Sequence, residues 1–437
     1  MAAQFLTSPL ETILNSQPDA VFCQLNDSSV SRSELLSHAW FISKQLPDKS
    51  HAVNLCSNRY LFIVCYLAVI LRNQINLLPA NQAQNTINDL LNHYQDSYYI
   101  TDNTDQFLGQ RYSVNEQQLQ TGIVQSINLD PQQIVSISFT SGSTGQPKAV
   151  HKTWREFHQA AVLATSRLGL QDKHWTVIST VPPQHMYGLE TTLYWPLFSN
   201  LAIANCHPFF PEDVRQATHA AATPSILVST PAHLKACVRA NLNWDNIAIV
   251  LSSTAPLEAQ LANQIESCFN VPLHEIFGST ETLSFASRRS TTNEGWQPYQ
   301  GVTVFSESNE FYVQGGHLQQ IYKLDDQLAI DCQGGFTVTG RNSDIIKIAG
   351  KKASLSELNR ILCQIEGVED GVFYYRNNLR LTAFVVSALD NKTIQAELRK
   401  SIDQVFLPRP LQTVKKLPRN SVGKIVKENL DRIIMES

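Results

Sequence analysis

Apolar and polar positions in the first part of the chain alternate between a helical and an extended pattern. Residues 31–46 place their apolar side chains on or near one face of a helix. The apolar run Tyr60–Leu71 predicts a buried helix, because it is shorter than the roughly 18–20 residues that cross a bilayer. Short apolar runs predict strands at residues 51–57, 75–81, 96–103, 175–180, 201–206, 225–230 and 247–253. Strands that alternate with helices predict an α/β fold of parallel sheets covered on both faces.

The pattern changes twice in the later part of the chain. From Gly301, short turn-linked apolar runs predict a smaller β-rich subdomain. From about Asn342, the sequence predicts a small α+β domain with a helix that begins in a Ser354–Glu357 capping box, a hairpin over residues 368–387 and a further helix over residues 393–406. We therefore predict a large N-terminal domain, residues 1–341, and a small mobile C-terminal domain, residues 342–437.

Charge and cysteine content restrict the class of protein. The formal net charge is −4 and the pI is near 6.3. A nucleic-acid-binding domain usually shows a basic stripe and a high pI, so no nucleic-acid partner is expected. None of the 8 cysteines forms a C-x-x-C pair, which disfavours a zinc ribbon or a thioredoxin-type site. Scattered cysteines and an N-terminal segment without a signal-peptide pattern predict a cytoplasmic protein with no membrane span.

The segment FTSGSTGQPKAV, residues 139–150, is a candidate phosphate-binding loop. Its glycines expose backbone N–H groups, its hydroxyls add donors and Lys148 adds a positive charge. The glycine spacing differs from that of a Walker A loop and no Ser or Thr follows Lys148, which argues against a phosphoryl-transfer kinase. Composition alone leaves a solvated Ser- and Gly-rich turn as the other interpretation.

The same segment resembles the signature loop of the adenylate-forming superfamily. That superfamily includes acyl- and aryl-CoA ligases, peptide synthetase adenylation domains and luciferases, and Ala149 stands where its glycine is usual. Further segments resemble the superfamily's motifs in their usual order: VPPQHMYGLE from Val181, SSTAPL at residues 252–257, FGSTE at 277–281, the interdomain segment at 324–354 and LPRNSVGKI at 417–425. In character the chain is most similar to stand-alone acyl- or aryl-acid-activating ligases.

The resemblance implies a two-step reaction. A carboxylic acid attacks the α-phosphate of ATP and forms an acyl-adenylate and pyrophosphate. A pantetheine thiol, of coenzyme A or of an acyl carrier protein, then displaces AMP. The implied cofactors are ATP, Mg²⁺ and coenzyme A or phosphopantetheine, and the expected assembly is a monomer or homodimer. The pocket region includes His185, Met186, Tyr187, Tyr194 and Trp195, and this composition suits an aryl or medium acyl acid better than acetate.

The resemblance also assigns the ATP-binding residues. The β- and γ-phosphates would be held by Thr140, Ser141, Gly142, Ser143, Thr144, Gly145 and Lys148. Thr254, Ala255, Phe277 and Gly278 would lie at adenine, Thr280 at the α-phosphate and Glu281 at Mg²⁺. Outside the motif, Phe277 would be interpreted as a core aromatic and Glu281 as a surface charge.

The remaining assignments concern ribose, catalysis and the acceptor. Asp326 matches the ribose-binding aspartate, with Asp325 as the alternative register, and Arg341 would contact ribose or phosphate. Lys424 would stabilise the charge that develops on the α-phosphate and carboxylate, and His185 would orient the acid. Gly350 would line the pantetheine channel, and Ser343 stands at the usual hinge position.

Three alternatives stay open on the sequence. A non-catalytic adenylate-binding regulatory protein would explain the departures at Ala149 and Ser343, but the retained Lys148, Glu281 and Lys424 argue against it. A luciferase-like oxygenase is the second alternative. The third is an amino acid substrate, which would need an acidic partner for its ammonium group, and Glu190 is the candidate.

Overall fold

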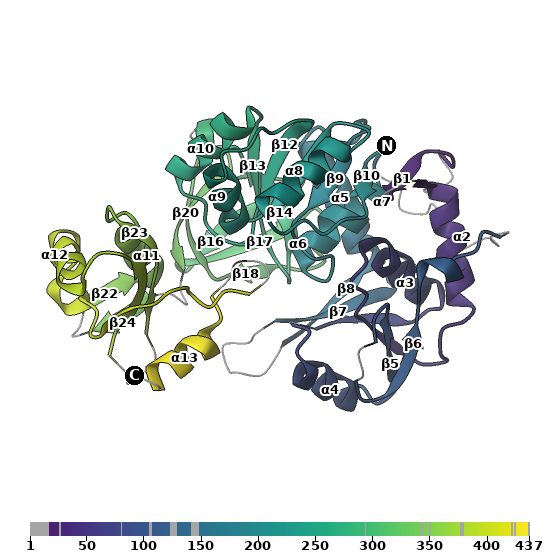
Figure 1. The fold of residues 1–437 in the computed structure, drawn as a ribbon, viewed down its shortest axis with the longest axis horizontal. Helices are drawn as coiled ribbons and strands as arrows, with labels where there is room; N and C mark the ends of the chain where they lie inside the picture. The colour runs from purple at the N-terminus through teal and green to yellow at the C-terminus, as the bar shows by residue number, and fades with distance from the viewer. Residues whose placement is uncertain are drawn as a thin grey trace. The chain divides into compact units, whose positions relative to one another are not determined.

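A computed structural model describes most of the chain, and its ribbon is drawn in Figure 1. The described residues are 17–25, 28–79, 81–104, 107–122, 129–140, 148–292, 294–341, 345–348, 351–375, 380–420, 423 and 425–435. The chain divides into two compact units. The first contains Met1–Val302 and Gln314–Gln320, and the second contains Thr303–Val313 and Ile321–Ser437.

A nine-stranded sheet forms one half of the first unit. Its strand order is β15-β14-β13-β12-β11-β9-β10-β1-β2, with a parallel centre from β13 to β1 and antiparallel pairs at both edges. The strands are β1 (Val21–Gln24), β2 (Ser29–Ser31), β9 (Thr176–Ser179), β10 (Ala202–Ala204), β11 (Ser225–Ser229), β12 (Ile247–Ser252), β13 (Leu273–Ser279), β14 (Leu283–Arg288) and β15 (Gln297–Pro298).

A six-stranded sheet forms the other half of this unit. Its order is β6-β5-β3-β4-β7-β8, and every pair is parallel except β7 with β8. The strands are β3 (His51–Asn54), β4 (Ile75–Leu78), β5 (Ser97–Thr101), β6 (Gln110–Ser113), β7 (Ile134–Thr140) and β8 (Lys148–Thr153). The predicted strands and the predicted α/β class are therefore confirmed.

Helices cover both sheets, as Figure 1 shows. They are α2 (Arg32–Ser43), α3 (Arg59–Leu71), α4 (Gln84–His93), α5 (Trp154–Arg167), α6 (Met186–Leu189), α7 (Trp195–Leu197), α8 (Pro211–Ala220), α9 (Pro231–Arg239) and α10 (Ala259–Phe269). Helix α3 is buried at every position from Arg59 to Ile70, as expected for a helix that is apolar on all sides. Its Tyr66 hydroxyl lies 3.0 Å from the Tyr194 hydroxyl, and the Tyr194 ring stacks on Phe157 with centroids 4.0 Å apart.

The second unit consists of small sheets and three helices among its described residues. Its strands are β16 (Val302–Glu307, which starts at the last residue of the first unit), β17 (Glu310–Gly315, which ends in the first unit), β18 (Tyr322–Leu324), β19 (Asp326–Ile330), β20 (Phe336–Arg341), β21 (Ile345–Ile348), β22 (Lys351–Ser354), β23 (Val368–Tyr374), β24 (Thr382–Ser387) and β25 (Leu411–Thr413). Its helices are α11 (Leu355–Cys363), α12 (Asn391–Ser401) and α13 (Lys427–Met435). Helices α11 and α12 pack a core that includes Leu362, Ile394 and Leu398 against the β23–β24 hairpin.

Two details of the C-terminal prediction differ from the structure. Ser354 is the N-cap of α11, but its side chain makes no cap hydrogen bond, so the predicted capping box is wrong. The predicted helix over residues 393–406 ends at Ser401, where Ile402 takes an extended backbone. The predicted domain boundary lies between residues 341 and 342, where a segment outside the described residues begins, and it stays a prediction together with the mobility of the C-terminal domain.

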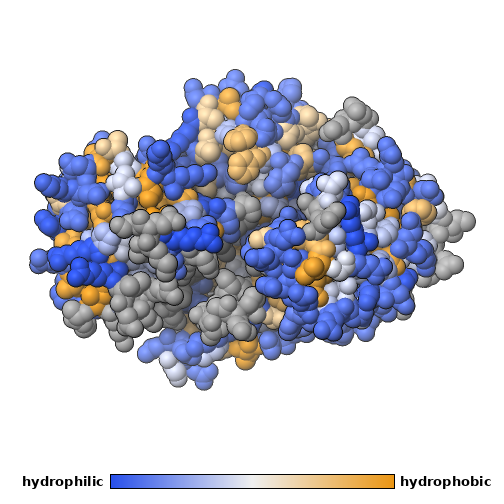
Figure 2. All heavy atoms as spheres, turned by 60° about the horizontal axis from the view of Figure 1, so that its bottom comes forward, coloured by the Kyte–Doolittle hydropathy of each residue, from blue (hydrophilic) through white to orange (hydrophobic). Residues whose placement is uncertain are grey.

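The surface in Figure 2 is mostly hydrophilic, with apolar side chains in small scattered patches. Among the described residues, the exposed large apolar side chains are Val21, Leu108, Phe209, Phe210, Ile321 and Val338. Within the same residues, no helix combines the length and the apolar character needed to cross a membrane.

Candidate active site

The hairpin between β13 and β14 presents Thr280 and Glu281 at its tip. The Ser279 N–H donates to Thr282 Oγ1 at 2.9 Å, and the Thr282 N–H donates to Ser279 Oγ at 3.2 Å, which closes the turn. A Cβ on Gly278 would lie 2.0 Å from the Leu283 carbonyl oxygen, so this position accepts only glycine. Thr280 and Glu281 are half-buried. The sequence motif FGSTE is therefore a tight, sterically defined turn with one carboxylate at its tip.

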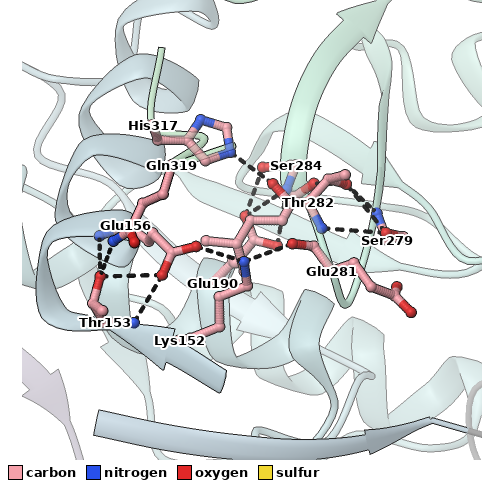
Figure 3. Close-up of polar contacts among 11 residues, drawn as sticks. Lys152, Thr153, Glu156, Glu190, Ser279, Glu281, Thr282, Ser284, His317 and Gln319 are labelled. Atoms are coloured by element: carbon pink, nitrogen blue, oxygen red, sulfur yellow. Dashed lines mark hydrogen bonds and ion pairs between the residues drawn. The ribbon is translucent and has the colours of Figure 1, made fainter. Parts of the chain in front are cut away.

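A buried lysine holds this hairpin from the side of the six-stranded sheet. Lys152, in β8, places Nζ 2.6 Å from the Glu281 carbonyl oxygen and 2.7 Å from Glu156 Oε1 (Figure 3). The side chains of Lys152 and Glu156 are only 1% and 4% exposed. In Figure 3 the Glu281 side chain extends away from these groups. Its backbone is thus fixed while its carboxylate stays directed outward.

Two further buried groups hold the strand that follows the turn. Glu190 accepts hydrogen bonds from the Ser284 N–H and from Ser284 Oγ, the latter at 2.6 Å. His317 donates from Nε2 to the Thr282 carbonyl oxygen at 2.7 Å, which fixes its neutral tautomer. Burial raises the pKa of Glu190 to about 7 and lowers the pKa of His317 to about 4. Figure 3 shows both side chains beside the strand that follows the turn.

The predicted adenine contacts lie at the carboxyl ends of the adjacent parallel strands β12 and β13. Phe277 is half-buried, with its ring centroid 5.0 Å from Trp296 and 5.4 Å from Phe285. Ser253 Oγ donates to the Ile276 carbonyl oxygen at 3.0 Å and ties the 252–257 turn to β13. Ligands of open α/β sheets bind at this end of the strands. The structure therefore brings the predicted adenine residues Thr254, Ala255, Phe277 and Gly278 to one edge.

Thr254 adopts a strained backbone in this turn. Its φ is +80°, in the left-handed region that β-branched residues avoid. Such strain costs about 1–3 kcal/mol and concentrates at binding and catalytic sites. The conformation of Thr254 is thus an independent structural indication that the turn serves a ligand.

The predicted phosphate loop is closed at its base by β7 and β8. Thr140 and Lys148 pair across these antiparallel strands, and Lys148 is exposed. The intervening Ser141, Gly142, Ser143, Thr144 and Gly145 lie outside the described residues. Lys152 lies on the strand that leaves this loop, so one strand connects the loop to the Glu281 hairpin.

His185 is the N-cap of α6, which continues into a π-helical turn over Glu190–Tyr194. Its Nδ1 accepts from the Tyr187 N–H at 3.3 Å, and the residue is half-buried. Tyr194 and Trp195, which the sequence suggested for the acid pocket, have no exposed surface. Both residues belong to the core and pack between helices. They therefore give no evidence on which carboxylic acid the protein binds. Single π turns inside helices are frequent at functional sites.

The residues predicted to bind ribose lie on one hairpin of the second unit. Asp326 and Arg341 are directly paired across β19 and β20, whereas Asp325 precedes β19 and is exposed. Asp326 is half-buried. The register places the two predicted positions opposite each other. The side chain of Arg341 and the residues Ser343 and Gly350 are outside the described part of the chain.

The residues on both sides of Lys424 form a closed loop, although Lys424 itself lies outside the described residues. The Val426 N–H donates to the Pro418 carbonyl oxygen at 2.9 Å, and Arg419 pairs with Ile425 across the loop. Arg419 Nη1 donates to the Gly423 carbonyl oxygen at 2.7 Å. Backbone hydrogen bonds and Arg419 therefore join the described residues that precede and follow Lys424.

The sequence analysis missed Lys152, Glu156 and His317. A signal for the first two existed, because Lys152 and Glu156 are four positions apart and Thr153-x-x-Glu156 is a capping box, which the structure confirms at α5. His317 has no local signal, since it reaches Thr282 only through the tertiary fold.

Comparison with known proteins agrees with this geometry. Residues 15–317 match the family of AMP-binding enzymes. The chain belongs to this family. The predicted membership of the adenylate-forming superfamily is therefore confirmed, and the AMP-binding match gives no support to the alternative of a non-catalytic adenylate-binding protein.

Relatives in the AMP-binding family include two named ligases. The chain is 27% identical over 369 residues to a 2-succinylbenzoate–CoA ligase of Oceanobacillus iheyensis, which covers 75% of this chain and 76% of the relative. It is 24% identical over 295 residues to a 4-coumarate–CoA ligase of Cereibacter sphaeroides, which covers 65% of this chain and 69% of the relative.

This chain shares its fold with solved structures. An O-succinylbenzoate coenzyme A synthetase from Bacillus subtilis, in complex with ATP and magnesium ion, has a TM-score of 0.83 at 17% identity and covers 97% of this chain and 99% of its own. An ATP-bound MatB from Rhodopseudomonas palustris has a TM-score of 0.84 at 16% identity. This match covers 98% of this chain and 99% of the MatB chain. The likeness establishes the fold over nearly the whole chain.

The donor set at the hairpin fits Mg²⁺. The described residues contain no group of three or more His, Cys, Asp or Glu side chains arranged to hold a metal ion. Mg²⁺ is usually bound through one or two carboxylates, several waters and the phosphates of a nucleotide. The single outward-directed carboxylate of Glu281 matches that requirement.

Proposed function

We propose that this AMP-binding enzyme is an ATP-dependent acid–thiol ligase that activates an aryl or medium acyl carboxylic acid as its acyl-adenylate and transfers the acyl group to a pantetheine thiol. The observation that carries the proposal is the family match over residues 15–317, which contains the phosphate loop, the His185 segment, the adenine turn and the Glu281 hairpin.

Each group has a chemical role in the first step. The acid's carboxylate oxygen attacks the α-phosphorus, the bond to the β-phosphate oxygen breaks, and pyrophosphate leaves. Both reactants are anionic, so neutralisation of charge and positioning should dominate the rate. Lys148 and the 141–147 loop would hold the leaving pyrophosphate, Thr280 the α-phosphate and Lys424 the charge on the reacting oxygens. Glu281 would hold Mg²⁺, which neutralises phosphate charge when bound.

The nature of the acid is supported by two observations. The two ligases named above act, by their names, on 2-succinylbenzoate and 4-coumarate, which are carboxylic acids with an aromatic ring. Glu190, the candidate partner for an amino acid's ammonium group, is 4% exposed and already accepts hydrogen bonds from Ser284. An acid without an amino group therefore fits this chain better than an amino acid.

The acceptor that we propose is coenzyme A, because both named relatives are CoA ligases. An acyl carrier protein would present the same phosphopantetheine thiol. In the second step the thiol sulfur attacks the acyl carbon, AMP leaves with the bonding electron pair, and the thiol proton is released. His185 is proposed to orient the acid in the first step.

Product analysis tests the proposal. The protein would be incubated with Mg²⁺, ATP, a panel of aryl, acyl and amino acids, and either coenzyme A or a phosphopantetheine-bearing carrier protein. We expect AMP and an acyl-CoA thioester by mass spectrometry for an aryl or medium acyl acid. AMP formation with amino acids alone would contradict the proposed substrate class, and thioester on the carrier protein alone would contradict the proposed acceptor.

A further inference from the structure

Lys152 has no assigned role, and the residues around it suggest one that rests on the proposed function. We propose that Lys152 is a positioning residue that fixes Glu281, the proposed metal ligand, relative to strand β8 at the base of the predicted phosphate loop. The proposal concerns the geometry of Mg²⁺–ATP binding rather than the chemical step.

The first support is the path of the chain. Strand β8 begins at Lys148, which adjoins the phosphate loop, and Lys152 lies four residues further along the same strand. From there its Nζ reaches the Glu281 carbonyl oxygen at 2.6 Å, across 129 positions in sequence. One side chain therefore links the base of the phosphate loop to the hairpin tip that carries the metal-binding carboxylate (Figure 3).

The second support is the cost of the arrangement. Lys152 is fully buried, and a buried ion pair is often no more stabilising than apolar residues of similar volume. Packing alone would be served as well by a methionine. What a methionine would not supply is a donor for the Glu281 carbonyl. The lysine is thus explained by its contact with the hairpin rather than by core stability.

The third support is the role of Glu156 beside it. Glu156 Oε1 pairs with Lys152 Nζ at 2.7 Å, while Oε2 accepts from the Thr153 N–H at 2.9 Å. The Glu156 carboxylate balances the charge of Lys152 and connects the Lys152 side chain to the first turn of α5. Further along the chain, His317 and Glu190 hold Thr282 and Ser284. Buried polar groups therefore hold the backbone from Glu281 to Ser284, and among them Lys152 contacts Glu281 directly.

A set of variants separates positioning from stability. Lys152→Met with Glu156→Gln removes the contact with Glu281 and leaves no unpaired buried charge, and the glutamine keeps an acceptor for the start of α5. Glu156→Gln alone is the matched control, because it removes the ion pair but keeps the lysine and its contact with Glu281. Lys152→Leu with Glu156→Gln is a second test variant should the first double variant fold poorly, because it also removes the donor and leaves no unpaired buried charge.

The decisive readout is the Mg²⁺ dependence of ATP binding, measured by titration calorimetry of ATP at increasing Mg²⁺ concentration. We expect both double variants to need about 10- to 100-fold more Mg²⁺ for half-maximal enhancement of ATP binding, as for other residues that orient a metal ligand. Glu156→Gln should keep the wild-type Mg²⁺ requirement even if its melting temperature falls.

Two outcomes would overturn the proposal. One is a folded double variant with the Mg²⁺ requirement of the wild type. The other is an equal loss of ATP affinity with and without Mg²⁺, which would assign Lys152 a structural role only. Because binding is measured without the acid, a wild-type protein that binds Mg²⁺–ATP but makes no thioester would contradict the proposed function and leave this test interpretable.

Discussion

Arg419 and Asp370 form a two-point ion pair next to the loop that carries Lys424. The distance from Nη2 to Oδ1 is 2.8 Å and that from Nε to Oδ2 is 3.1 Å, and the side chains are 31% and 34% exposed. Planar guanidinium–carboxylate pairs of this kind add geometric specificity as well as energy. Since Arg419 also donates to Gly423, strand β23 and the loop are joined through one guanidinium.

The first prediction concerns Asp370→Asn. It should lower the rate of acid-dependent pyrophosphate exchange up to about 5-fold, because a partly exposed ion pair contributes about 0.2–1 kcal/mol to holding the loop. Glu397→Gln is the control, since Glu397 pairs with Lys400 on the exposed face of α12 in the same unit. Equal exchange rates for the two variants would contradict the role of the Arg419–Asp370 pair.

A second prediction concerns the strained turn. Thr254→Gly should raise the free energy of unfolding by about 1 kcal/mol, because glycine adopts a positive φ without the strain of a β-branched residue. The greater entropy of glycine in the unfolded chain offsets part of this stabilisation. Thr254→Ala keeps a Cβ at the same φ and should gain less. Thermal unfolding of both variants checks this, and a glycine variant less stable than the alanine variant would refute it.

A third prediction concerns the pH dependence of stability through Glu190. Burial raises its pKa from the ordinary 4.5 to about 7 in the fold, so the unfolded chain loses this proton first as pH rises. The unfolding free energy should therefore fall between pH 4.5 and pH 7, by roughly 3 kcal/mol from this group.

Glu190→Gln removes this titration and keeps an acceptor for Ser284. The unfolding free energy of the variant minus that of the wild type should grow as pH rises from 5 to 8, measured by denaturant unfolding at each pH. The variant is compared with the wild type at each pH because other groups also titrate. Burial lowers the pKa of His317 to about 4, so His317 contributes stability that is lost as pH falls in both proteins. A difference that does not change with pH would show that Glu190 is not held as a buried carboxyl.

A fourth prediction concerns Gly278→Ala. The new Cβ would lie 2.0 Å from the Leu283 carbonyl oxygen, so the hairpin must shift at a cost of about 1–3 kcal/mol. Pyrophosphate exchange by the folded variant should also fall, by more than its loss of stability explains, because the shift displaces Thr280 and Glu281. Gly122→Ala is the control, since a Cβ there meets no atom within 4 Å. Similar melting temperatures and activities for the two variants would contradict the steric argument.

The sequence predicted those parts of the fold that have local causes. Continuous apolar runs such as Tyr60–Leu71 became the buried helix α3, and the alternating pattern became two mostly parallel sheets. The Ser354 capping box failed because a cap hydrogen bond depends on side-chain geometry, which the sequence pattern does not fix.

The candidate site was predictable through its motifs but not through its supports. The segments at Thr254, Phe277 and Glu281 were found by resemblance, and the structure brings them to one edge of the nine-stranded sheet. The contacts of Lys152 and His317 with the hairpin join residues far apart in sequence, so only the fold reveals them. Lys424 and residues 141–147 lie outside the described residues, and their roles stay predictions.

The central claim, activation of an acid as its adenylate, is tested most directly by exchange of labelled pyrophosphate into ATP. The account predicts exchange by the wild-type protein with at least one aryl or medium acyl acid, dependent on Mg²⁺. It also predicts that Lys424→Ala and Glu281→Ala abolish or strongly reduce this exchange. No exchange with any acid of the panel would contradict the proposed function, and undiminished exchange in either variant would contradict the role assigned to that residue.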